Sequence, residues 1–142
     1  MDYETISARD FGQGLRGLGL NLLCRDLRRE AAFLTDVFGM AAHRVSDAFA
    51  IMTLGGDLFQ LHGDIAFATH PLHGLLPEAG PRGAGLELRL YDCDPDAACA
   101  RAAAHPDATI LHPPTDKAGH GLREAVILSP EGYAWVPSRP LG

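Results

Sequence analysis

Two stretches of the chain repeat the same alternation of leucines with other residues. Residues 85–92 read Gly-Leu-Glu-Leu-Arg-Leu-Tyr-Asp, and residues 19–26 read Gly-Leu-Asn-Leu-Leu-Cys-Arg-Asp. A period of two residues predicts a strand with two different faces. An acidic residue ends each stretch and a helix-like pattern follows it, which indicates an internal duplication. We expect the leucine faces to pack against helices and the opposite faces to look into a shared interior.

The first unit is predicted to contain a strand, a helix and three more strands. After a strand at Leu18–Cys24, Asp26 can cap the start of a helix and Gly39 can end it. Apolar residues between them follow helical spacing in one stripe: Leu27, Ala31, Leu34 and Phe38. Turn residues then separate three expected strands: Ala41–Val45, Ala48–Leu54 and Leu58–His62.

The second unit is predicted to repeat this order. Asp94-Pro95 follows its first strand (85–91) as a capping acid with proline at the first helical position, and opens an alanine-rich helix at Asp96–Ala104. The three remaining strands are expected at Thr109–His112, Leu122–Leu128 and Tyr133–Val136. We divide this one structural domain into an N-terminal arm (1–16), a first βαβββ module (17–63), a linker (64–83) and a second βαβββ module (84–142).

The arm and the linker lack a clear pattern. Because the arm is polar and glycine-rich with no period, we expect it to pack on the domain or on a partner chain. The linker is rich in histidine, proline and glycine, so no regular element is expected there.

Composition narrows the class of protein. Of 142 residues, 46% are hydrophobic and 21% charged, as in globular domains, and no apolar run approaches the ~20 residues of a membrane span. Three cysteines cannot all pair, and no signal-peptide pattern is present, which favours reduced thiols in the cytoplasm. A net charge of −6 argues against nucleic acid or an anionic membrane as a partner and leaves a small neutral or cationic ligand open.

The order of elements and one phrase of the sequence resemble a known superfamily. The phrase is Gly121-Leu122-Arg123-Glu124, followed by Ser129-Pro130-Glu131-Gly132-Tyr133. It resembles the glyoxalase/bleomycin-resistance/extradiol-dioxygenase (vicinal oxygen chelate) superfamily, although aspartate is usual where Ser129 stands. Over about residues 17–138, the resemblance implies an α+β fold in which two βαβββ modules form a curled mixed sheet around a cleft. It also implies a homodimer, but it selects no reaction, because members include isomerases, dioxygenases and drug-binding proteins.

The resemblance also bears on metal binding. Metal-dependent members hold a divalent ion with two histidines and one or two carboxylates on facing strands. Overlay of the two units places Gly19, Gly85, Gln60 and Val136 at those positions. Glycine and valine offer no donor atom, and an amide oxygen is a weak ligand, so we expect neither a metal nor another cofactor.

Four polar residues are predicted to face the interior: Asn21, Gln60, Glu87 and Arg89. Glu87 and Arg89 are two apart on one strand, so they share a face and are expected to pair. In one interpretation they form a structural salt bridge. In the other, Arg89 binds an anionic or carbonyl group while Glu87 binds a cation or acts as a general acid or base.

Other candidates lie on the neighbouring strands. His62 shares the face of Gln60 and is a candidate base, whereas the remaining histidines show no metal-binding spacing. Tyr133 and Trp135 share a face of the last strand and would form an aromatic wall for a flat ligand or plug the cavity. Of Arg123 and Glu124, alternation lets only one point inward.

Three functions remain open from the sequence. The leading hypothesis is binding, or transformation without a metal, of a small organic molecule in the cleft. The second is a metal-dependent lyase, isomerase or dioxygenase with a relocated site of Gln60, His62 and Glu87. The third is a non-catalytic interaction module whose cleft is closed by side chains such as Leu23, Phe59 and Trp135, and it predicts no sizeable cavity.

Overall fold

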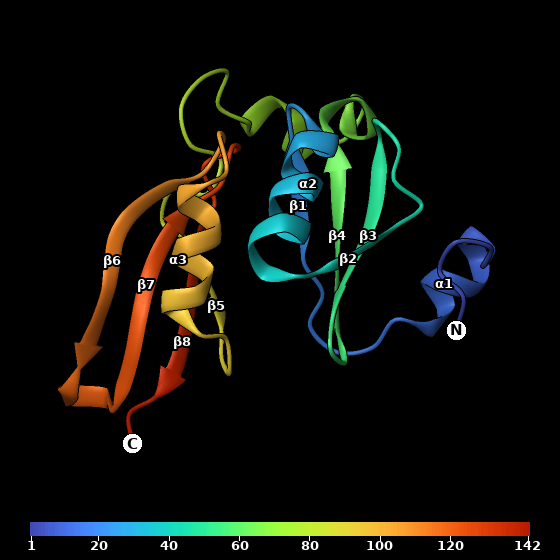
Figure 1. The fold of residues 1–142 in the computed structure, drawn as a ribbon. Coiled ribbons are helices and arrows are strands. Elements are labelled where there is room, and N and C mark those ends of the chain that lie inside the picture. The colour runs from blue at the N-terminus through green and yellow to red at the C-terminus, as the bar shows by residue number, and fades with distance from the viewer.

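The chain folds into three α-helices and two four-stranded sheets, as a computed structural model of residues 1–142 shows (Figure 1). The helices are α1 (Ala8–Gly14), α2 (Leu27–Phe38) and α3 (Pro95–Ala103). The strands of the first sheet are β1 (Asn21–Cys24), β2 (Ala41–His43), β3 (Phe49–Leu54) and β4 (Asp57–Gly63). Those of the second sheet are β5 (Glu87–Leu90), β6 (Thr109–Lys117), β7 (Leu122–Leu128) and β8 (Ala134–Pro140). None of the helices combines the length and the apolarity that a membrane crossing needs.

The two sheets have the same topology. Their strand orders are β1-β4-β3-β2 and β5-β8-β7-β6, and in each the first strand pairs in parallel with the last. This repeat confirms the predicted duplication of a βαβββ module. Each module forms its own mixed sheet, as predicted, and no backbone hydrogen bonds join the two sheets, which lie side by side in Figure 1.

The helices α2 and α3 contact each other and share one hydrophobic core with both sheets. Local signals define α2, since the Asp26 side chain accepts the Arg29 N–H and Gly39 ends the helix in the left-handed conformation, with φ of 70°. Its predicted apolar stripe is buried. Leu22 and Leu88, from the two alternating stretches, belong to this core, as expected for the strand faces that helices cover.

The N-terminal arm packs on its own domain. The Ser7 side chain caps α1 by accepting the Asp10 N–H. Phe11 of α1 is buried edge-on against Phe49, with ring centroids 6.2 Å apart. Ala50, the next residue of β3, lies in the core with α2, so alternation puts Phe49 and the arm on the opposite face of the sheet.

Several segments differ from the sequence-based expectation. The linker contains two short 3₁₀ helices, η1 (Asp64–Phe67) and η2 (Pro71–Leu75), and the His70 side chain caps η2 by accepting the Leu72 N–H. Strand β6 runs five residues beyond its predicted end at His112, because register shifts let it continue through Pro113 and Pro114. A third 3₁₀ turn, η3 (Ala118–His120), leads into β7.

Candidate functional site

The face of the first sheet that looks away from α2 carries Gln60 and His62. Their side chains contact each other, with 3.1 Å between His62 Nε2 and Gln60 Oε1. The His62 ring packs against Phe49 and Phe67 at centroid distances of 5.3 and 5.2 Å. Burial lowers the pKa of His62, which favours the neutral imidazole at pH 7.

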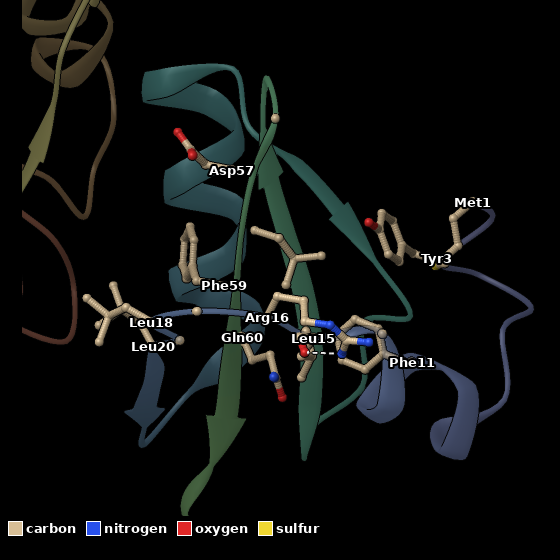
Figure 2. Close-up of a pocket in the computed structure, with 15 residues that line it drawn as sticks. Met1, Tyr3, Phe11, Leu15, Arg16, Leu18, Leu20, Asp57, Phe59 and Gln60 are labelled. Atoms are coloured by element: carbon tan, nitrogen blue, oxygen red, sulfur yellow. Dashed lines mark hydrogen bonds between the residues drawn. The ribbon is translucent and has the colours of Figure 1, made fainter.

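A cavity of about 480 Å³ lies between the N-terminal arm and β4, and we call it the arm cavity (Figure 2). Residues of the arm and of the approach to β1 form one wall: Tyr3, Phe11, Leu15, Leu18 and Leu20. Gln60 of β4 lies opposite them, and it also lines a hollow of about 520 Å³ beside α1 and Phe49. The arm therefore covers the face of the first sheet that looks away from α2, and it leaves space between itself and that face.

A second cavity, of about 370 Å³, lies where the two modules meet, and we call it the seam cavity. Nine of its twelve lining residues are hydrophobic, among them Leu18, Leu20, Met40, Phe59, Leu88 and Trp135. Its charged residues are Asp57, Glu87 and Arg89. Leu18, Leu20, Asp57, Leu58 and Phe59 line both cavities, so the arm cavity and the seam cavity are neighbours.

Carboxylates flank Arg89 on the wall of the seam cavity. Its guanidinium donates to Glu87 Oε1 at 2.9 Å, so the two side chains pair as predicted. It also donates to Glu124 of β7. Hydrogen bonds to Glu87 and Glu124 raise the pKa of Arg89. Although burial opposes it, Arg89 lowers the pKa of Glu124, which stays ionised at neutral pH.

Of the neighbouring pair Arg123 and Glu124, the glutamate is the residue that turns toward Arg89. Arg123 instead forms ion pairs with Asp96 and Asp116, the first of which belongs to α3. The alternation along β7 therefore separates them as predicted.

The structure brings together only some of the residues that the sequence singled out. Glu87, Arg89 and Trp135 line the seam cavity. Asn21 is exposed at the edge strand beside Gln60, and it lines neither of the two cavities. His62 lines neither cavity either.

The two aromatic residues near the C-terminus have separate roles. Tyr133 is buried in the core just before β8, where its hydroxyl donates to the Leu23 carbonyl oxygen at 2.8 Å. Trp135 lies in contact with Phe38 and Phe59, at centroid distances of 6.0 and 5.7 Å. Only Trp135 borders the seam cavity, so the predicted wall of both aromatic residues is not formed.

Sequence reasoning missed the leucines that border the two cavities. Leu20 was assigned to a helix-covering face and Leu18 to the same strand, but both precede β1, and Leu18 is 93% exposed. The available signal was the glycine on each side of Leu18, which interrupts the strand pattern.

The residues present do not fit the metal site of the metal-dependent proteins. Gly19 and Gly85 carry no donor. Strand pairing sets Gln60 opposite Asn21 and Ala134 opposite Glu87. The counterpart of Gln60 is therefore Ala134, which corrects the earlier match to Val136, and alanine offers no ligand either.

A relocated metal site is not assembled either. No group of three histidine, cysteine, aspartate or glutamate side chains lies close enough together to hold an ion. Gln60 and His62 are in contact, but Glu87 lines the seam cavity, to which His62 does not contribute.

Several solved structures are similar to this chain. A glyoxalase/bleomycin resistance protein/dioxygenase family enzyme from Burkholderia phytofirmans PsJN superposes with a TM-score of 0.71 at 22% identity, covering 86% of this chain and 96% of that one. A glyoxalase-related enzyme from Fulvimarina pelagi gives 0.68 at 16% identity, covering 88% of each chain. A glyoxalase/bleomycin resistance protein/dioxygenase from Nocardioides gives 0.66 at 19%, covering 94% and 91%. No protein-family model and no curated protein matches the sequence.

Proposed function

We propose that this chain, which has the fold of the glyoxalase/bleomycin resistance/dioxygenase proteins, binds a small organic molecule in the seam cavity. The observation that carries the proposal is a mostly apolar cavity of about 370 Å³ with a few charged groups. This combination is typical of small-molecule sites, whose volumes run from about 300 to about 1,000 Å³. An interaction module with a closed interior would have no such cavity.

The lining favours an apolar, flat ligand body. Phe59 and Trp135 present aromatic surface, and Leu88 and Met40 add aliphatic surface. Aromatic side chains favour stacked or edge-on contacts with flat groups. A planar, largely apolar molecule therefore fits this lining better than a polar, flexible one.

The charges favour a neutral or cationic polar group on that ligand. The positive charge of Arg89 is already matched by Glu87 and Glu124, so an anion would have to compete with two carboxylates. Asp57 adds a further negative charge to the lining. Glu87 keeps 55% of its side chain exposed and is available to a cationic group. If the ligand is also transformed, Glu87 is the carboxylate placed to move a proton.

The test uses Trp135, the only tryptophan, as the reporter of binding. Its fluorescence would be titrated with a panel of aromatic amines and with their neutral isosteres of the same shape. We expect saturable quenching by a subset of the amines. Glu87→Gln should weaken amine binding about threefold, because a half-exposed charge contributes less than about 1 kcal/mol, and should leave the neutral isosteres unchanged.

Two controls separate binding in the seam cavity from surface effects. Glu78→Gln removes an equally negative side chain from the exposed linker and should leave all affinities unchanged. Leu20→Lys places a positive charge at the cavity and should weaken amine binding. If no compound gives saturable quenching, or if Leu20→Lys binds like the wild type, the proposal is wrong.

A further inference from the structure

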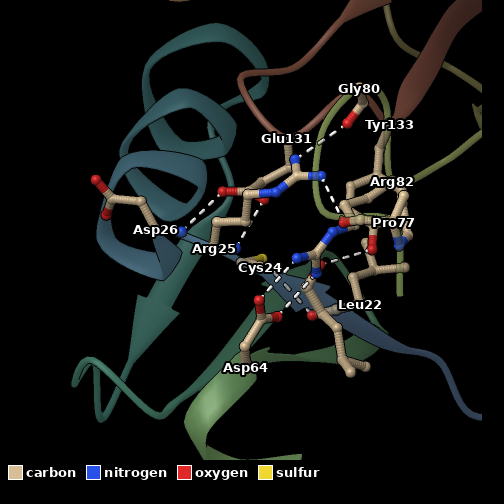
Figure 3. Close-up of polar contacts among 11 residues, drawn as sticks. Leu22, Cys24, Arg25, Asp26, Asp64, Pro77, Gly80, Arg82, Glu131 and Tyr133 are labelled. Carbon is tan, nitrogen blue, oxygen red and sulfur yellow. Dashed lines mark hydrogen bonds and ion pairs between the residues drawn. The ribbon is translucent and has the colours of Figure 1, made fainter. Parts of the chain in front are cut away.

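Two glutamates join the modules at the start of α2, at the opposite end of this helix from the seam cavity. Figure 3 shows Glu131, in the turn between β7 and β8, accepting the backbone N–H groups of Arg25 and Asp26 at 2.8 and 2.9 Å. In return, the backbone N–H of Glu131 donates to Oε1 of Glu30 in α2, at 3.1 Å. We call Glu30 and Glu131 the clasp, because each module supplies a carboxylate that accepts backbone N–H groups of the other.

The backbone around the clasp is closely packed. The Glu131 carbonyl oxygen accepts the Arg82 N–H of the linker at 2.9 Å. Gly132 has φ of 87°, and a Cβ atom there would lie 2.4 Å from the Pro81 Cα. Linker, turn and helix therefore meet at fixed positions, which sets the Glu131 carboxylate against the free N–H groups at the start of α2.

Neither carboxylate of the clasp has a bonded cation. Glu30 is fully buried, Glu131 is 4% exposed, and Oε2 of Glu30 has no hydrogen-bond partner. The nearby guanidinium groups are bonded elsewhere: Arg29 to Asp107, Arg82 to Asp64, and Arg25 to the carbonyl oxygens of Gly80 and Pro77. Two carboxylates thus share a nearly dry site, where one of them gains by holding a proton.

The other charged and titratable groups that face Glu30 do not supply the positive charge that the two carboxylates lack. Burial raises the pKa of Glu30 to about 7, with the Glu131 charge adding to the effect, while Ser129, the Glu131 N–H and Arg29 oppose it. Cys24 of β1 and Tyr133 next to the turn have raised pKa values, chiefly through burial, and stay neutral. Asp64 of η1 carries a lowered pKa through its bond to Arg82, so this pair adds no net charge.

We propose that the clasp is operated by a proton: it holds the two modules together while Glu30 is protonated, and it loosens when Glu30 ionises beside Glu131. The inference rests on the contacts between the modules and does not depend on the proposed ligand. Loosening of the clasp would be transmitted along α2, whose twelve residues span about 18 Å. Met40, just beyond the far end of α2, lines the seam cavity, so loosening at the clasp would change the spacing of the modules there.

The direction of the pH effect follows from the pKa of Glu30. Because this pKa is higher in the folded chain, near 7 instead of the ordinary 4.5, the folded state keeps a proton that the unfolded state has lost. The contribution to stability is complete below about pH 4.5 and is lost as the pH rises through about 7.

The test compares urea unfolding from about pH 5.5 to about pH 8.5 for the wild type, Glu30→Gln and the exposed control Glu78→Gln. Glutamine stays neutral and keeps the acceptor for the Glu131 N–H. We expect the wild type to lose stability relative to Glu30→Gln as the pH rises from about 5.5 towards 7, with the difference levelling off at higher pH, whereas Glu78→Gln should follow the wild type. Parallel pH profiles of the wild type and Glu30→Gln would overturn the proposal. All three proteins carry the same histidines, whose contributions to the pH profile cancel in this comparison.

A spectroscopic measurement keeps the proposal testable if Glu30→Gln does not fold. The chain has six glutamates, so carboxyl ¹³C resonances of labelled wild-type protein can be followed individually. One should titrate near pH 7, and Glu131→Gln should lower its midpoint because the neighbouring charge is removed. Exchange of the Arg25, Asp26 and Glu131 amides, corrected for intrinsic rates, should accelerate above that midpoint. The proposal is wrong if no glutamate carboxyl titrates near pH 7, or if the exchange rates of these amides do not change across that titration.

Discussion

Arg89 illustrates how a single residue depends on its partners in this fold. Its guanidinium lies between Glu87, which is half exposed, and Glu124, which is buried in β7. The buried carboxylate is tolerated only because the cation bonds to it, since an unpaired buried charge is costly. The positive charge of Arg89 is thus largely balanced by two carboxylates of the protein, and we therefore do not assign Arg89 to an anionic ligand.

Replacing Arg89 should expose this dependence. We expect Arg89→Met to lower the free energy of unfolding by about 3 kcal/mol at neutral pH, because Glu124 is left buried and unpaired. Arg89 lowers the pKa of Glu124, so the stability that this pair provides is lost in acid, and the difference between variant and wild type should shrink there. Arg139→Met is the control, since Arg139 is 44% exposed and pairs loosely with Asp94. Equal losses in the two variants, measured by urea unfolding at several pH values, would contradict this account.

The sequence could place Glu87 and Arg89 side by side because strand alternation is a local property. It could not place Tyr133, whose hydroxyl bonds to the Leu23 carbonyl oxygen 110 positions away. It also could not show Glu124 as the second partner of Arg89, because that contact depends on how β7 pairs with β8 and β8 with β5. Residue contacts within one strand were predictable, and contacts across the sheet were not.

At the scale of elements, helix boundaries were the most predictable feature. Asp26 and Gly39 cap α2, and Asp94 with Pro95 starts α3. These helix ends are therefore determined by residues close to them in the sequence. Helix α1 was missed because its seven residues bury only Phe11 and therefore show no period. Strand β6 was predicted too short because Pro113 and Pro114 are usually strand breakers, and here the register shifts accommodate them.

The turn between β7 and β8 offers a prediction at this scale. Gly132→Ala should lower the free energy of unfolding by about 2–4 kcal/mol, because alanine is strained at φ of 87° and its Cβ would meet Pro81. Gly119→Ala is the matched control, since a Cβ there has no neighbour within 4 Å and should change stability by less than about 0.5 kcal/mol. Urea unfolding of both variants checks the prediction, and a neutral Gly132→Ala would show that the turn can move away from the linker.

For the whole molecule, the superfamily resemblance implied the correct fold but not the relation of the modules. The repeated topology and the similar solved structures confirm the two βαβββ modules. That the sheets stay separate, with α2 and α3 in contact, depends on packing between residues far apart in the chain, which no local pattern reports. The seam cavity has the same origin, since β4 and β5 supply its walls from different modules.

Truncation of Phe59 should have the clearest effect on the seam cavity. It touches Trp135 and lines both cavities, so Phe59→Ala should merge them and admit water to the indole. We expect a loss of about 2–3 kcal/mol in the free energy of unfolding and a shift of the Trp135 emission to longer wavelength. Phe67→Ala, which removes a ring that packs on His62 and His70, should leave the emission unchanged. An unshifted spectrum of Phe59→Ala would show that the two cavities do not communicate through this side chain.

The clasp also determines how late during synthesis the start of α2 gains all of its hydrogen-bond partners. The N–H groups of Arg25 and Asp26 find their partner in Glu131, which follows them by 106 and 105 positions. At translation rates of about 5–20 residues per second, the first module waits about 5–20 s for this partner. During that time the start of α2 is held by contacts within the first module, such as the cap from Asp26 to Arg29. The first module is therefore completed only when the turn between β7 and β8 of the second module has been made.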